Sequence, residues 1–201
     1  MEKPILATDV DGVLLNWKGG VAAFNASRGV ATPREYLCPR NDVPLRQLFD
    51  TECRDQAYDL MIEFNRSPML GQLPLLDPSA VDVLQRLSQH FDIVAITSVG
   101  EWAETHERRR QNLKDLFGDV FREVVCLPLR VSKKEHLARF TEQGRVVAWF
   151  DDLAEHVETG KELGIPSYQF QFCPNGAPSK PGLFRSWRDI ESHLEQTMLV
   201  A

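Results

Sequence analysis

Five short apolar runs alternate with stretches of helical periodicity, and this alternation limits the folds open to the chain. Each run is rich in Val, Ile and Phe, nearly continuous, and too short for a helix, which is typical of a buried strand. Strands that alternate with helices predict an α/β, Rossmann-like parallel sheet of about five strands with helices on both faces. The runs are Pro4–Val10, Phe91–Thr97, Glu123–Leu127, Val146–Phe150 and Tyr168–Phe172.

Between the runs, capping and stop signals mark the helices. Asp77-Pro78 combines a cap with a proline in the first turn, and Gly118 is a stop signal. Ser132-Lys133-Lys134-Glu135 has the pattern of a capping box. We therefore expect helices after Asp77, over Glu101–Phe117, from Ser132 to about Gly144, over Leu153–Leu163 and after Ser186.

One stretch, residues 16–70, breaks the alternation because it contains no convincing strand. Thr32-Pro33-Arg34-Glu35 is a capping box with a proline in its first turn, which favours a helix. Four apolar residues further on keep helical spacing. We predict an α/β core of residues 1–15 and 71–201, with residues 16–70 inserted as a small helical cap over the strand ends. The four residues are Ala57, Leu60, Met61 and Phe64.

Charge and composition restrict the partners of the chain. The net charge is −6 over 201 residues and the pI is about 5.4, which argues against a nucleic-acid polymer as partner. A small phosphorylated metabolite is compatible with this charge, because one local cation can dominate a pocket. No segment is apolar enough to be a leader or a membrane span, so we expect a cytoplasmic protein that binds no membrane. The sequence leaves the oligomeric state open.

The four cysteines form no C-x-x-C pair, which favours reduced and mostly buried thiols. They are Cys38, Cys53, Cys126 and Cys173.

Acidic and hydroxyl side chains gather at the strand ends. In an open parallel sheet the active site lies beyond the carboxyl ends of the strands. Asp9 and Asp11 are two residues apart, so both can meet one cation and one substrate. The adjacent acids Asp151 and Asp152 repel each other unless a cation compensates, which favours a metal. Thr97 and Ser98 end another apolar run.

Simpler structural explanations exist for several of these residues. A D-x-D-x-D-G calcium loop fails, because aligning Gly12 with the loop glycine places Ala7 at the first ligand position. A turn with solvated carboxylates is the other alternative for Asp9 and Asp11. Lys133 and Lys134 open a helix, where a cation is disfavoured, so either an anion in the pocket or a solvated surface pair would account for them. Arg108-Arg109-Arg110 is interpreted as a solvated helix face.

Taken in order, four motifs resemble those of the haloacid dehalogenase superfamily. They are Asp9-x-Asp11-Gly12-Val13, then Thr97 after a strand, a helix-opening lysine, and Asp151-Asp152 after a strand. The match spans residues 5–152. The acid at position 11 favours the phosphatase branch, so the resemblance implies a Mg²⁺-dependent hydrolase of phosphate monoesters. It also implies an α/β core with an inserted cap.

The resemblance implies a role for each residue. Asp9 would attack phosphorus to give an aspartyl-phosphate, and Asp11 would protonate the leaving oxygen and then activate water. Thr97 and Ser98 would hold phosphate oxygens. Lys133, with Lys134 as the alternative, would offset the negative charge. Mg²⁺ would be held by the Asp9 carboxylate, the Asp11 carbonyl and the Asp152 carboxylate, with Asp151 acting through water or orienting the site.

A narrower resemblance concerns the leaving group. The stretch from Asp9 to Gly20 and the segment Ser186-Trp187-x-Asp189-Ile190 are similar to 5'(3')-deoxyribonucleotidases. That similarity implies that Trp17 faces the base of a nucleotide. Two other functions stay open on the same fold: a phosphorylation switch, in which phosphorylated Asp9 is stable, and a non-catalytic binding protein.

Overall fold

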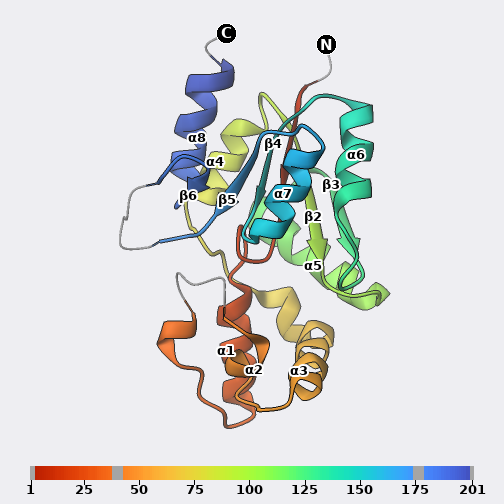
Figure 1. Cartoon of the computed structure of the whole chain (residues 1–201), viewed down its shortest axis with the longest axis vertical. Helices are drawn as coiled ribbons and strands as arrows, with labels where there is room; N and C mark the ends of the chain where they lie inside the picture. The colour runs from red at the N-terminus through yellow and green to blue at the C-terminus, as the bar shows by residue number, and fades with distance from the viewer. Residues whose placement is uncertain (1–2, 38–42, 174–178, 200–201) are drawn as a thin grey trace.

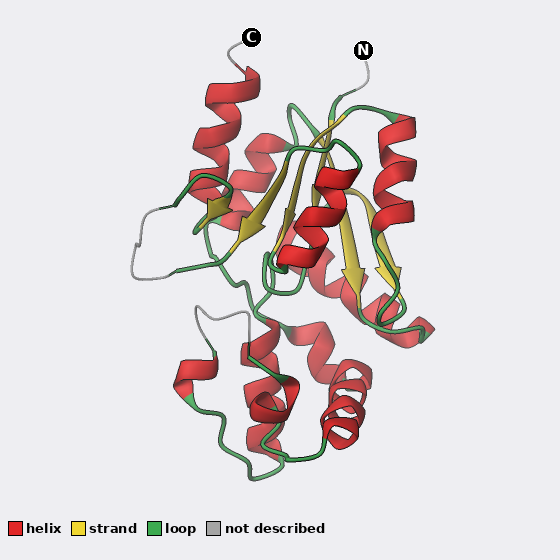
Figure 2. Cartoon of the chain, viewed as in Figure 1, coloured by secondary structure: helices red, strands yellow, loops and turns green. Residues whose placement is uncertain are grey.

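A computed structural model describes residues 3–37, 43–173 and 179–199 (Figures 1 and 2). Its sheet has six strands, all paired in parallel, in the order β3-β2-β1-β4-β5-β6. This confirms the predicted α/β, Rossmann-like class. The strands are β1 (Ile5–Thr8), β2 (Asp92–Ser98), β3 (Phe121–Leu127), β4 (Val146–Asp151), β5 (Ser167–Phe170) and β6 (Leu183–Phe184).

The sixth strand accounts for the difference from the expected five. β6 is two residues long, and its residues pair with the end of β5. A strand this short leaves no alternating pattern in the sequence, so periodicity could not have found it.

Helices cover both faces of the sheet, and the side chains of β1 alternate between two cores. Leu6 lies in a core with residues of α4 (Ala80–Leu87), α5 (Ala103–Phe117) and α8 (Trp187–Leu194). Its neighbours Ile5 and Ala7 lie in a second core with residues of α6 (Lys134–Gln143). The helix α7 (Ala154–Glu162) packs on β4 and β5. A final π-helical turn, η3, spans Glu195–Leu199.

Buried hydrogen bonds fix the start of two core helices. Asp77 is buried, and its carboxylate accepts hydrogen bonds from the backbone N–H groups of Ser79 at 2.9 Å and Trp187 at 2.7 Å. One carboxylate thus joins the start of α4 to the start of α8. The Ser186 hydroxyl accepts from the Asp189 N–H at 3.2 Å, so it caps α8 as predicted.

A group of helices lies beyond the carboxyl ends of the strands, at the lower end of Figure 1. The described residues between 16 and 70 contain no strand. The predicted spacing from Ala57 to Phe64 forms one buried face of α3, whereas the capping box at Thr32 precedes only the short helix η1. The division into a core and a cap of residues 16–70 stays a prediction. The helices are α1 (Trp17–Ser27), η1 (Arg34–Tyr36), α2 (Leu45–Leu48), α3 (Arg54–Arg66) and η2 (Pro68–Gln72).

Three of the four cysteines fall within the described residues. Cys53, Cys126 and Cys173 are free thiols. None of the three is fully buried and Cys53 is exposed, so the expectation of mostly buried thiols is wrong for them; Cys38 lies outside the described residues.

A helix that spans a membrane must be both long and apolar. Within residues 3–37, 43–173 and 179–199, no helix combines that length and that apolar character.

Candidate active site

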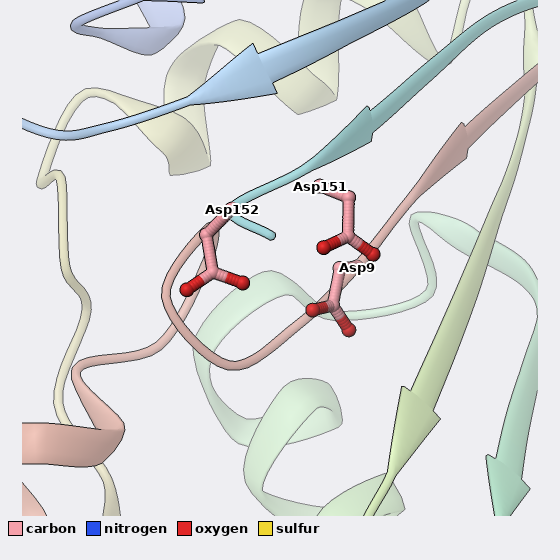
Figure 3. A group of neighbouring side chains, drawn as sticks. All are labelled: Asp9, Asp151 and Asp152. Atoms are coloured by element: carbon pink, nitrogen blue, oxygen red, sulfur yellow. The ribbon is translucent and has the colours of Figure 1, made fainter. Parts of the chain in front are cut away.

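Three carboxylates converge where β1 and β4 end, as Figure 3 shows. β1 and β4 are neighbours in the sheet, and the Asp9 N–H donates to the Phe150 carbonyl at 2.8 Å. Asp9, Asp151 and Asp152 each offer an oxygen atom, and these atoms lie within 4.8 Å of one another. Asp9 and Asp151 are buried. The two acidic motifs that are far apart in the sequence therefore form one cluster.

Gly12 allows the turn after β1 to pass close to Asp152. Its φ is +81°, a conformation that side chains with a Cβ rarely adopt. A Cβ at this position would lie 2.4 Å from Asp152 Oδ2. The absence of a side chain at Gly12 therefore permits both the turn after β1 and the close approach of this turn to Asp152.

Lys133 links two of the carboxylates. Its Nζ lies 2.8 Å from Asp9 Oδ1 and 2.8 Å from Asp151 Oδ2, and the side chain is buried. Burial alone lowers the pKa of Lys133, but the carboxylates of Asp151 and Asp9 outweigh it and hold that pKa above its ordinary value. Lys134 instead pairs with Glu162 at 2.8 Å on the surface. Of the two lysines that the sequence left as alternatives, Lys133 is the one that lies at the carboxylates.

Both carboxylate oxygens of Asp151 accept hydrogen bonds from other groups of the protein. Oδ1 accepts from the Leu153 N–H at 2.8 Å, and Oδ2 accepts from Lys133 Nζ at 2.8 Å. His156 Nδ1 lies 3.2 Å and 3.1 Å from the two oxygens. Burial raises the pKa of Asp151, but Lys133 and His156 outweigh it and lower that pKa below its ordinary value.

The charge of the cluster is not balanced by Lys133 alone. Burial raises the pKa of Asp9 to about 7; Lys133 opposes this rise and the Asp151 charge adds to it. Burial and the charges of Asp151 and Asp9 raise the pKa of Asp152 well above its ordinary value. Lys133 pairs with Asp9 and Asp151, and three acids gathered so closely favour either bound protons or a further cation.

Asp11 forms an ion pair with Arg109 of α5. Arg109 Nη2 lies 2.7 Å from Asp11 Oδ1 and 2.8 Å from Oδ2. Burial raises the pKa of Asp11, and Arg109 opposes that rise. The interpretation of Arg108-Arg109-Arg110 as a solvated face is wrong for Arg109, which is fully buried.

Sequence reasoning missed Arg109 and His156. Thr105, Arg109 and Leu113 are spaced four residues apart and are all buried, so helical periodicity could have placed Arg109 on the inner face of α5. The run of three arginines obscured that signal. His156 follows Asp151 by five residues in α7, and no spacing rule identifies such a contact.

A cavity of about 380 Å³ opens over the acids. Asp9, Asp11, Thr97, Ser98 and Lys133 are among its lining residues. The Thr97 hydroxyl is buried there, and within residues 3–37, 43–173 and 179–199 it has no hydrogen-bond partner. The remaining walls are mainly apolar and include Trp17, Leu45, Leu48, Met61, Leu129 and Phe172.

Trp17, the predicted contact of the leaving group, lies on the wall of this cavity. Its Nε1–H donates to Asn65 Oδ1 at 3.1 Å, and its ring meets the rings of Phe64 and Phe49 edge to face at 5.6 Å and 6.4 Å. These contacts hold the indole in one orientation.

Comparison with known sequences yields one relative of undefined activity. No family model matches the chain. An uncharacterized 32.4 kDa protein of Enterobacteria phage T4, from the Gp30-rIII intergenic region, is 28% identical over 199 residues, covering 96% of this chain and 70% of the relative.

Solved structures are similar in fold. A candidate phosphatase of Clostridium difficile matches with a TM-score of 0.67, at 18% identity over 96% of this chain and 99% of its own. Protein tyrosine kinase A of Mycobacterium tuberculosis matches with a TM-score of 0.68, at 15% identity over 96% of this chain and 98% of its own. The candidate haloacid dehalogenase-type hydrolase YfnB of Bacillus subtilis, bound to magnesium, matches with a TM-score of 0.59, at 14% identity over 96% of this chain and 99% of its own. At these identities the likeness shows the fold.

Proposed function

We propose that this chain, which has the haloacid dehalogenase-like fold, is a Mg²⁺-dependent phosphatase that hydrolyses a small phosphate monoester through an aspartyl-phosphate. One observation carries the proposal: a cluster of three carboxylates, two of them paired with one buried lysine, lies against a cavity that Asp9, Asp152 and Lys133 line. A carboxylate repels a phosphate dianion unless cations lie beside both. Lys133 meets part of this need, and a divalent cation would meet the rest.

Asp9 and Asp11 divide the chemistry between them. Asp9 attacks phosphorus, and the bond from phosphorus to the leaving oxygen breaks while Asp11 gives that oxygen its proton. Asp11, now ionised, takes a proton from water. The resulting hydroxide attacks the aspartyl-phosphate, releases inorganic phosphate and restores the Asp9 carboxylate.

The Thr97 hydroxyl supports a phosphate site beside Asp9. A buried hydroxyl without a partner costs about 1–3 kcal/mol, and a phosphate oxygen placed in the cavity would satisfy it. Ser98 lines the same cavity and would offer a second hydroxyl.

The donor set fits Mg²⁺, which prefers oxygen ligands. The carboxylates of Asp9 and Asp152 and the Asp11 carbonyl would hold it. Asp151 already receives hydrogen bonds from Leu153 and Lys133, which suits a role outside the coordination sphere. When bound, Mg²⁺ would neutralise charge on the transferring phosphoryl group.

The substrate is a small phosphorylated metabolite, with a nucleotide as one candidate. The cavity volume of about 380 Å³ suits a small molecule, and Trp17 would face its leaving group. Asp9 is 6% exposed, so a small phosphate ester can reach it more readily than a partner protein can. This burial favours the phosphatase over a phosphorylation switch.

Release of inorganic phosphate from a panel of monoesters, with Mg²⁺ and with EDTA, tests the proposal. We expect turnover that requires Mg²⁺. Phosphorylation of Asp9 by acetyl phosphate without turnover would establish the switch instead, and binding of phosphate esters without either reaction would establish a binding protein.

Mg²⁺ should stabilise the protein more at about pH 8 than at about pH 6. Without metal, burial raises the pKa of Asp9 to about 7, so its carboxyl binds a proton more tightly folded than unfolded. The contribution of this bound proton to the free energy of unfolding is present at low pH, and it is lost as the pH rises through the pKa of Asp9 in the folded protein. The ionised carboxylates then bind Mg²⁺ more tightly.

Thermal unfolding with and without Mg²⁺ at both pH values measures this difference. Asp152→Asn should lose most of the Mg²⁺ effect, whereas Asp82→Asn, at an exposed position of α4, should keep it. An equal Tm increase at both pH values would contradict the prediction.

A further inference from the structure

We infer that Arg109 is a positioning residue that holds the Asp11 carboxylate for proton transfer. The inference rests on the proposed phosphatase function and deepens it. It assigns a role in the reaction to a helix residue that lies outside the four motifs and outside the lining of the cavity.

The contact restrains Asp11 closely. A single nitrogen, Arg109 Nη2, lies 2.7 Å and 2.8 Å from the two oxygens of the Asp11 carboxylate. Charge-assisted hydrogen bonds from this nitrogen to both oxygens restrain the position of the carboxylate. The Asp11 side chain is 21% exposed, so without Arg109 it could turn toward solvent.

The burial of Arg109 points to a purpose beyond filling space. The side chain is fully buried, and its Nε and Nη1 atoms have no hydrogen-bond partner among the residues that the structure describes. Such an arrangement is costly, and an apolar side chain of similar size would fill the same volume at a lower cost. The one ion pair that the structure gives the guanidinium, in the part of the chain that it describes, is the pair with Asp11.

The consequence for catalysis depends on the leaving group. An alkoxide is a poor leaving group and requires the proton of Asp11, whereas 4-nitrophenolate leaves without one. Misplacing Asp11 should therefore slow release of the leaving group far more with an alkyl phosphate than with 4-nitrophenyl phosphate. Hydrolysis of the aspartyl-phosphate, which also uses Asp11, is the same step for both substrates, so leaving-group release in the first turnover is the rate to compare. A residue that only supported the fold would affect both substrates alike.

The test compares Arg109→Met and Arg109→Lys with the wild type on 4-nitrophenyl phosphate and on the alkyl phosphate that the wild type hydrolyses fastest. For Arg109→Met we expect the rate of leaving-group release in a single turnover to fall about 10- to 100-fold on the alkyl phosphate and less than about threefold on 4-nitrophenyl phosphate. Arg109→Lys should recover part of the loss. Arg110→Met, at the exposed next residue of α5, is the matched control and should behave as wild type.

The same variants in an Asp11→Asn background decide whether Arg109 acts through Asp11. We expect Arg109→Met to add no further loss of activity in that background. Because the double variant removes both charges of the buried pair, neither group is left without its partner, and it can be studied even if Arg109→Met alone folds poorly. Equal losses on the two substrates, or losses that multiply in the double variant, would overturn the inference and leave the phosphatase standing. Absence of turnover by the wild type on every monoester would overturn both.

Discussion

Asp9→Asn should lower kcat for phosphate release by about 10⁴-fold or more, because an amide cannot replace the carboxylate as nucleophile. The amide has nearly the same shape, so the packing of β1 against β4 should survive. The variant should also unfold at the same temperature as the wild type or higher, because it removes a carboxylate whose ionisation burial opposes.

Steady-state phosphate release and thermal unfolding measure the two effects. In the wild type, acid-quenched samples should carry phosphate on Asp9, located by mass spectrometry of the peptides. Asp82→Asn is the control, since it changes an exposed acid to the same amide. A loss smaller than about tenfold in Asp9→Asn would reject Asp9 as the nucleophile.

Lys133→Met should remove activity and destabilise the fold, whereas Lys134→Met should do neither. Methionine keeps the length of lysine but leaves the buried carboxylates of Asp9 and Asp151 without their shared ammonium group. Removing one partner of a buried ion pair typically costs about 3–5 kcal/mol. The exposed pair of Lys134 with Glu162 contributes about 1 kcal/mol at most.

Urea unfolding and phosphate release, measured for both variants, give the comparison. The destabilisation in Lys133→Met should shrink as the pH falls toward about 7, because loss of Lys133 raises the pKa of Asp9 further and the variant takes up this proton at a higher pH than the wild type. A loss of activity in Lys134→Met that matched the loss in Lys133→Met would contradict the assignment of Lys133 to the site.

The parts of the structure that could be predicted are those with a local, repeating signal. Buried parallel strands are continuous apolar runs, and helices carry their own caps and spacing, so the α/β class followed from the sequence. Ser186 and the spacing from Ala57 to Phe64 are examples in which the local pattern was sufficient. β6 lacks any such repeat because it is two residues long.

The contacts within the candidate site needed information that no local pattern holds. Lys133 precedes the first residue of α6, and the direction of the helix there sends Lys133 to Asp9 and leaves Lys134 at the surface. The pairing of Arg109 with Asp11 depends on how α5 packs against the turn after β1. The substrate depends on the walls of the cavity, which side chains from many segments build together.

The close approach of Gly12 and Asp152 also constrains the order in which the site can form. The turn after β1 fits against the Asp152 carboxylate, so it has its final surroundings only after β4 has paired with β1. These two strands are neighbours in the sheet but lie far apart in the sequence, at Ile5–Thr8 and Val146–Asp151, and pairings of such long sequence separation form slowly. A partly folded chain would therefore hold Asp9 and Asp11 but no binding site for phosphate. Recovery of activity during refolding would report the completion of the sheet's centre.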